Sequence, residues 1–471
     1  MAAAQRQSPN RVSITQIVSV YPKASHPPKL INLSNLDRQC PVLMYLVFFY
    51  KPSSDILTVS DDAVFSGLKN GLEETLSAWY PAAGRLTKDS IDGKLNLWCN
   101  NGGALVVEAV SQVEMSELGD LSQYEEFYES LVFKPVVNGD MSEMPLVVAQ
   151  VTRFRCGGYS LGIGTSHSLF DGPATYEFLC AWASASQSNV NNKGSQTLDD
   201  KWYNKPVHDR GRLLIASATN QTPLTQPNTS KSSAAMRVAA IDHLYQLIKE
   251  VAYRGHDHKD GGNFVLRTFR LDRAMIHKLK HHCTSGDKRG VSFSTFEVIA
   301  AHLWKARTKA LELSKDRTAC LQFAVDTRTR IVPPLPKGFS GNAFVLASIA
   351  LKVGELEEET HEAIIGRIKE AKNSISNDYV EAYIKALEGP QAGNLPPLKE
   401  LTIVSDWRRV PFHKINFLGK EAAYASPLVP PLPQVAYLMQ IPDDTEGIDV
   451  RIGLLPSMEA PFSRYFLANL L

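Results

Sequence analysis

Hydrophobic and polar positions alternate with the two-residue period of β-strands along much of the N-terminal half of the chain. The alternation predicts short strands, and two pairs of them are separated by Gly-containing turns that are typical of hairpins. We expect one hairpin at 94–110 and another at 145–167. The stretches predicted as strands are 11–22, 42–50, 94–100, 104–110, 145–154 and 159–167.

Apolar residues recur every three or four positions in other stretches, as on the buried face of an amphipathic helix. This spacing predicts helices over 62–79, 172–185 and 292–313. The last of these has the clearest start, because Ser294 and Glu297 have the spacing of a capping box.

Between about residues 184 and 234 the periodicity is lost, and Asn, Ser and Thr dominate. This composition is typical of a linker or a long surface loop. At 471 residues the chain is also long for one hydrophobic core, since single cores stop growing near about 250–300 residues. We therefore expect an N-terminal domain at 1–190, a polar crossover linker at 191–261 and a C-terminal domain at 262–471.

The composition, with 44% hydrophobic and 21% charged residues, is that of a soluble globular protein. The formal net charge of +1 gives no strong field that would attract nucleic acid or an anionic membrane, so the expected partner is a small molecule. Six cysteines without a C-x-x-C motif indicate reduced thiols. Neither a signal peptide nor an apolar run of membrane-spanning length is found, so a cytoplasmic location is expected by default, with association at the cytosolic face of the endoplasmic reticulum left open.

Several familiar catalytic patterns are incomplete in this sequence. "GIGTSHS" lacks the second half of a nucleophile elbow, and there is no phosphate-binding P-loop. His277 and His281 are four residues apart, but no Glu follows His277 as a zinc protease requires, which favours a solvated helix face. His256 and Asp260 in "GHDHKDGG" are interpreted as part of an exposed turn. No metal site is predicted.

The remaining candidate is "TSHSLFDG", which contains His167 and Asp171. Because about one His-x-x-x-Asp is expected by chance among 12 His, the context has to decide. The segment joins a predicted buried strand to a helix, which places the imidazole at the mouth of a cleft, and Gly172 lets the backbone turn without steric cost. An imidazole with an ordinary pKa near ~6.5 suits a general base, although a hydrogen-bonded core histidine is an alternative at this stage.

"HSLFDG" and five further segments occur in an order and approximate spacing that resemble the plant BAHD acyltransferases. These are "YPAAGRL", "CNNGGALVVEA", "SFSTFEVIAAHLWKAR", "VDTRTRIVPPLPKGFSGNAFV" and "VSDWRRVPFHKINFLGKEAAYASP". "LINLSNLDRQCPVLMYLVFFYK" and "GLEETLSAWYPAAGRL" are most similar to the brassinosteroid-inactivating members. The resemblance implies an α/β fold of two chloramphenicol-acetyltransferase-like domains, each a mixed β-sheet flanked by helices, with a channel at their interface. It also implies a monomer.

The resemblance implies an acyl-CoA-dependent O-acyltransferase, with acyl-CoA as a co-substrate and no bound cofactor. The expected acceptor is a hydroxyl of a small plant metabolite, with a brassinosteroid-like hydroxysteroid as the first candidate. His167 would deprotonate the acceptor, which attacks the thioester directly. Ser405, in place of the Thr in the family's T-x-W, would stabilise the oxyanion, and Trp407 would line the site. Asp171 would pair with Arg328, or alternatively with Arg330.

One motif departs from the family pattern. "NFLGK", residues 416–420, replaces D-F-G-W-G, with Asn416 at the Asp position and Gly419 retained. In the family this motif is chiefly structural and supports the CoA side. The eceriferum-like members depart from this motif in a similar way. A non-catalytic auxiliary protein of lipid metabolism is therefore the alternative from a different functional class. An N-acyltransferase acting on an amine is a further alternative.

Overall fold

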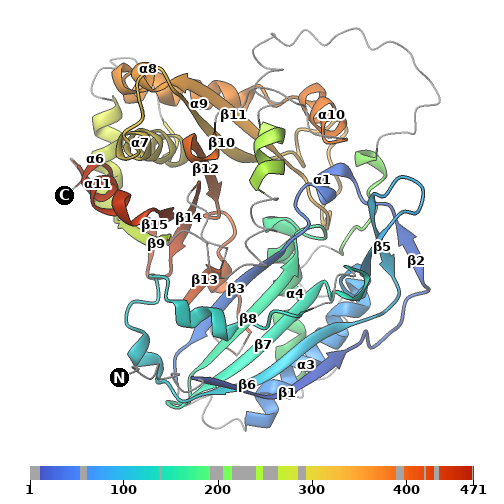
Figure 1. Ribbon diagram of the computed structural model, residues 1–471. Helices are drawn as coiled ribbons and strands as arrows, with labels where there is room; N and C mark the ends of the chain where they lie inside the picture. Colours follow the sequence, from blue (N-terminus) through green and yellow to red (C-terminus); the bar gives the residue numbers. More distant parts are fainter. Residues whose placement is uncertain are drawn as a thin grey trace, which may run out of the picture.

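The computed structural model contains two six-stranded mixed sheets and one three-stranded sheet (Figure 1). The first large sheet is built mainly from the N-terminal half and the second from the C-terminal half, with helices packed on both. The residues that the structure describes are 11–52, 61–136, 141–190, 205–214, 240–247, 264–284, 293–388, 397–417, 419, 421–428, 434–468 and 470.

The first sheet has the strand order β1-β6-β7-β8-β3-β13, in which only β6 and β7 run parallel. Its strands are β1 (Val12–Val20), β3 (Leu43–Tyr50), β6 (Ala104–Ser111), β7 (Val147–Phe154), β8 (Tyr159–Ser166) and β13 (Tyr424–Leu428). The small sheet consists of β2 (Lys29–Ile31), β5 (Leu95–Cys99) and β4 (Arg85–Lys88). The helices of this half are α1 (Asn35–Arg38), α3 (Asp61–Ala78) and α4 (Gly172–Val190).

The second sheet has the order β11-β10-β12-β14-β15-β9, with β12 parallel to both of its neighbours. Its strands are β9 (Val265–Leu271), β10 (Thr318–Asp326), β11 (Phe344–Lys352), β12 (Leu401–Asp406), β14 (Val435–Ile441) and β15 (Asp444–Leu454). Its helices are α6 (Arg273–Thr284), α7 (Thr295–Ala310), α8 (Val353–Glu358), α9 (His361–Asn373), α10 (Asn377–Ala386) and α11 (Pro456–Leu467). Short 3-10 turns occur at Tyr80–Ala83, Met115–Leu118, Glu126–Leu131, Met141–Glu143, Gly211–Leu213, Leu398–Glu400 and Phe412–Lys414.

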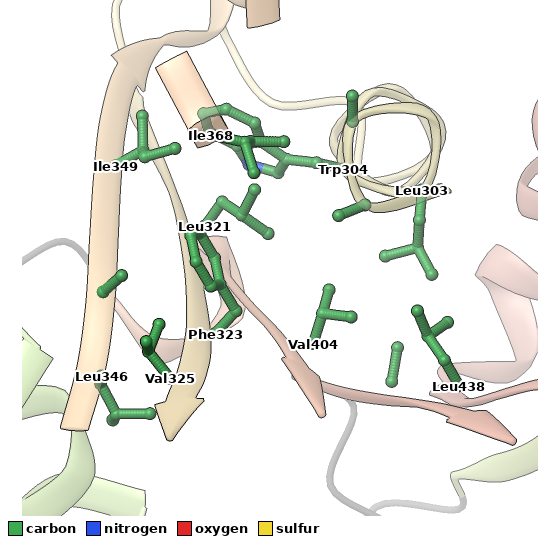
Figure 2. Close-up of a cluster of buried hydrophobic side chains, with 14 of the residues drawn as sticks. Leu303, Trp304, Leu321, Phe323, Val325, Leu346, Ile349, Ile368, Val404 and Leu438 are labelled. Atoms are coloured by element: carbon green, nitrogen blue, oxygen red, sulfur yellow. The ribbon is translucent and has the colours of Figure 1, made fainter. Parts of the chain in front are cut away.

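The helix predicted at 292–313 is α7, and its capping box is confirmed, because Ser294 accepts from the Glu297 amide and Glu297 accepts from the Ser294 amide. One face of α7 is fully buried against the second sheet. Figure 2 shows Leu303 and Trp304 of this helix above apolar side chains of the sheet, among them Leu321 and Phe323. The remaining residues labelled there are Val325, Leu346, Ile349, Ile368, Val404 and Leu438.

The hairpin predicted at 94–110 is wrong, although both of its strands are present as β5 and β6. β5 pairs with β2 and β4, whereas β6 pairs with β1 and β7. Between them Asn101 and Gly103 have φ angles of 55° and 77°, so the chain turns from one sheet to the other. Alternation predicts a strand but carries no information about its partner. The hairpin predicted at 145–167 is confirmed as β7 and β8.

One strand from the C-terminal half of the chain belongs to the first sheet. β13 follows β12 in the sequence but pairs with β3 of the first sheet, as Figure 1 shows. Residues 205–214 lie between the halves, where Arg210 is buried and His208 contacts both Ser340 and the carbonyl of Ala78. Much of the predicted linker at 191–261 lies outside the described residues. The domain limits drawn from the sequence stay a prediction.

Candidate active site

His167 directly follows β8, a strand that is buried along its whole length. The strand is packed closely: a Cβ on Gly162 would lie 2.0 Å from the carbonyl oxygen of Leu131, so only glycine fits there. The His167 amide donates to the Val42 carbonyl at 2.8 Å, and its half-buried ring lies 5.7 Å from the ring of Phe344. The imidazole is thus fixed where the first sheet meets β11 of the second.

Asn342 determines the tautomer of His167. The Asn342 Nδ2 donates to the His167 carbonyl at 2.8 Å and to Asp37 Oδ1 at 3.2 Å, so its Oδ1 must be the atom that faces the ring. That oxygen lies 3.1 Å from His167 Nδ1 and can only accept. Nδ1 therefore carries the proton, and Nε2 is left with the lone pair that a general base needs.

Asp37 is the buried anchor of this arrangement. Its Oδ1 accepts not only from the side chain of Asn342 but also from the backbone N–H of that residue, at 2.9 Å. Its Oδ2 accepts from the Ser34 hydroxyl at 2.7 Å and lies 3.5 Å from Nε of Arg210, which is itself buried. A buried carboxylate is tolerated because it is paired and hydrogen-bonded. Asp37 fixes Asn342, which in turn fixes the imidazole.

Asp171 forms a buried bidentate ion pair with Arg328, the partner expected from the sequence. Both contacts are 2.8 Å, and the two side chains are 4% and 17% exposed. Asp171 also accepts from the amides of Ala174 in α4 and Ala343 beside Asn342. Burial alone would lower the pKa of Arg328, but the charge and hydrogen bonds of Asp171 raise it. Arg330 instead donates to the carbonyls of Lys372 and Ile375.

The turn does not depend on the freedom of a glycine at Gly172. Gly172 begins α4, its φ lies outside the left-handed region, and a Cβ placed there would meet open space. The turn is stabilised instead by Asp171, whose side chain accepts from the Ala174 amide in the first turn of the helix.

Ser405 and Trp407 lie at the end of β12 and contact each other. Trp407 Nε1 donates to Ser405 Oγ at 2.9 Å, so the Ser hydroxyl proton can point elsewhere. The Trp407 ring packs edge-on against Phe412 and Tyr437. An apolar cluster formed by Met44, Trp407, Val435, Tyr437 and Met439 joins β3 to the second sheet here.

The "NFLGK" segment is bound to the first half of the molecule. Phe417 is buried, with its ring 5.2 Å from Trp182 and 5.8 Å from Phe48. The Asn416 carbonyl accepts from Gln187, while Asn416 Oδ1 is buried without a hydrogen-bond partner among the described residues. Gly419 is exposed with φ of 79°, a conformation that favours glycine. Leu418 and Lys420 lie outside the described residues.

Sequence reasoning missed Asn342 and Asp37. Asn342 lies in the Gly- and Pro-rich loop of a quoted motif, but nothing in its spacing relates it to a histidine 175 positions earlier. Asp37 has one local signal, the Ser34-x-x-Asp37 spacing of a capping box, which is present. The other histidine candidates differ: His277 and His281 are exposed, and His256 and Asp260 lie outside the described residues.

Comparison with known sequences gives two kinds of match. The Transferase family model matches residues 10–462. Brassinosteroid-related acyltransferase 1 of Arabidopsis thaliana is 53% identical over 97% of this chain and 98% of its own length. Omega-hydroxypalmitate O-feruloyl transferase of the same species is 29% identical over 95% of this chain and 91% of its own length.

Solved structures share the fold. Vinorine synthase aligns with a TM-score of 0.72 at 19% identity, covering 97% of this chain and 98% of that protein. TRI101 of F. sporotrichioides, solved with coenzyme A and T-2, aligns with a TM-score of 0.62 at 14% identity over 92% and 97% of the two chains. These matches confirm the predicted α/β fold of two sheet-and-helix domains.

Proposed function

The chain belongs to the Transferase family, the BAHD acyltransferases, and from this premise we propose that it transfers an acyl group from acyl-CoA to a hydroxyl of a brassinosteroid-like hydroxysteroid, with His167 as the general base. The activity class, acyl transfer, follows from the family and its relatives. The proposed acceptor rests on 53% identity to a protein whose name links it to brassinosteroids.

The observation that supports the proposed mechanism is the 3.1 Å contact between His167 Nδ1 and Asn342 Oδ1, from which the tautomer follows. With Nδ1–H held by Asn342, the Nε2 lone pair takes the acceptor's hydroxyl proton while the oxygen attacks the thioester carbonyl. The tetrahedral intermediate collapses with cleavage of the C–S bond, and Nε2–H returns the proton to the CoA sulfur. The ester and free CoA leave, and no acyl-enzyme forms.

Ser405 is the proposed oxyanion donor. Its oxygen already accepts from Trp407, which leaves the hydroxyl proton for the developing negative charge. One such donor typically contributes about 2.7–4 kcal/mol to catalysis. The neighbouring cluster of Met44, Tyr437 and Met439 supports an apolar acceptor, because these side chains are mainly apolar and offer few hydrogen-bonding groups to a polar molecule.

The test measures CoA release and the ester product with acetyl-, medium-chain and aromatic acyl-CoAs against hydroxysteroids, other plant alcohols and amines. We expect ester formation by the wild type and a loss of at least about 10²-fold in His167→Ala. His277→Ala, which changes an exposed histidine, is the matched control and keeps full activity. Equal turnover by His167→Ala would refute the general base. A folded wild type that binds no acyl-CoA would favour the auxiliary protein, and amide products would favour the N-acyltransferase.

None of the helices in the described part of the chain combines the length and apolar character needed to cross a bilayer.

A further inference from the structure

A cavity of about 300 Å³ lies in the helical layer on the second sheet. Its lining comes from α6, α7, α8, the first residue of α9 and the C-terminal segment around α11, which gather at one side of Figure 1. None of its lining residues contributes to the candidate active site. The polar lining consists mainly of groups that are or can become cationic: His282, His302, Lys305, Lys309 and His361.

The hydrogen bonds at the floor of this cavity have a defined direction. His302 is buried, and its Nε2 lies 2.7 Å from the Phe466 carbonyl, which can only accept, so Nε2 carries the proton. Nδ1 of neutral His302 must then accept from Nε2 of His361, 3.2 Å away. The remaining nitrogen of the pair, Nδ1 of His361, is the position where an added proton is held.

The positive charges around the floor of this cavity are only partly neutralised by neighbouring carboxylates. Lys305 donates to the carbonyls of Glu357 and Glu359, which leaves one of its three protons for another acceptor. Lys309 lies over the ring of Tyr465, 4.6 Å from its centre. The Glu359 carboxylate is already bound by Arg367. Glu357, exposed at the rim, is the one carboxylate among the described lining residues.

We propose that this cavity binds a small oxyanion of the phosphate or sulfate type, held by Lys309, the remaining proton of Lys305 and the protonated ring of His361. His282, whose ring lies 5.5 Å from that of His361, stands at the entrance as a further donor. A metal ion does not fit, because both ring nitrogens of His302 are in use and no cluster of three metal-ligating side chains exists among the described residues. The size suits a small ligand.

The electrostatics of the cavity agree with this assignment. Burial, together with the charges of His302, Lys305 and His282, lowers the pKa of His361 to about 4. Burial also lowers the pKa values of His302 and Lys305. A bound dianion opposes these effects and raises the pKa of His361, so the site takes up a proton as the anion binds. Affinity therefore rises as the pH falls.

Sulfate is the best probe, because its charge is constant between pH 5.5 and 8. Titration calorimetry on the full-length protein, at ionic strength matched with chloride, should show one site that binds roughly fivefold or more tightly at pH 5.5 than at pH 8. In His361→Gln the amide still donates to His302 but cannot become a cation, so this pH dependence should disappear. Lys309→Gln should weaken binding roughly tenfold.

Lys385→Gln, an equal loss of charge at an exposed position of α10 outside the cavity, should bind sulfate as the wild type does. His167→Ala should also bind normally, which separates this site from acyl transfer. The proposal is overturned if the wild type binds sulfate no better than chloride, or if all the variants bind alike. Phosphate titrated in parallel at pH 8 tests whether the site accepts a second tetrahedral oxyanion; rejection of phosphate would restrict the ligand class to sulfate.

Discussion

The polar groups around His167 and those around Ser405 are held in very different ways. In the first region Asp37, Asp171 and Asn342 each make several hydrogen bonds, with partners from both halves of the molecule. In the second, the Ser405 side chain has one hydrogen bond among the described residues, from Trp407, and in the loop that follows β12 the Asn416 Oδ1 is buried without a partner among them. The imidazole is fixed by a connected network, whereas the region around Ser405 depends on individual side chains and apolar packing.

This difference predicts that substitutions in the two regions have different effects on stability and on activity. The buried groups near His167 depend on one another for their hydrogen bonds, so a substitution of any one of them should lower both the stability and the activity of the protein. Removing the Ser405 hydroxyl leaves one group, the Trp407 indole N–H, without its acceptor, and Trp407 is only partly buried, so substitutions at Ser405 should change activity far more than stability. The following substitutions test that division, beginning with the largest expected effect.

Asp171→Ala should be the most damaging change. It removes the buried partner of the Arg328 guanidinium, which keeps only the half-exposed Asp326 at 3.3 Å, and should lower the free energy of unfolding by about 3 kcal/mol. Acyl transfer should fall with it, because Asp171 also holds the amide next to Asn342. Denaturant unfolding gives the stability. The double variant Asp171→Ala/Arg328→Met should recover part of the loss, since no unpaired charge remains; an unchanged single variant would show that the ion pair contributes nothing.

Ser405→Ala should reduce kcat by about 10²-fold or more, while the free energy of unfolding falls by less than about 1 kcal/mol because only the hydrogen bond from Trp407 is lost. The cause is loss of the hydroxyl that we propose for the oxyanion, without any change in the network around His167. Ser405→Thr keeps a hydroxyl and serves as the control, with activity close to that of the wild type. Retained turnover in Ser405→Ala would mean that the oxyanion is stabilised elsewhere.

The sequence identified the histidine of the first region and the ion pair beside it, but not the residues that hold the imidazole in place. His167, Asp171 and Arg328 could be selected because a motif and a charge that needed a partner identified them. Asn342 and Asp37 could not, since contacts across 175 and 305 positions depend on how the two sheets meet. The same limit explains β5 and β6: local alternation predicted the strands, but their partners are decided by tertiary packing. Helix α7 was predictable because its cap is local.

Asn342→Ala tests whether that missed residue positions the base. We expect kcat to fall about 10–100-fold, a loss typical of residues that orient a functional side chain, with little change in KM. The pH dependence of kcat should also change, because Asn342 selects the Nδ1–H tautomer of His167. Asn342→Gln, which keeps an amide at greater length, should recover part of the activity. A change in KM alone would assign Asn342 to substrate binding.

Asn416→Asp should have the smallest overall effect of these substitutions, and it tests most directly whether the second region lacks a buried ion pair. It restores the Asp of the family motif at a position where the side-chain oxygen is buried without a donor. An added charge there has no partner among the described residues, but the residue as a whole is only partly buried, so we expect a loss of about 1 kcal/mol in the free energy of unfolding. Asn416→Ala removes the unpaired oxygen and should be close to neutral. If Asn416→Asp instead stabilises the protein, a cation must approach this oxygen, and the second region would then contain an ion pair comparable to that of Asp171 and Arg328.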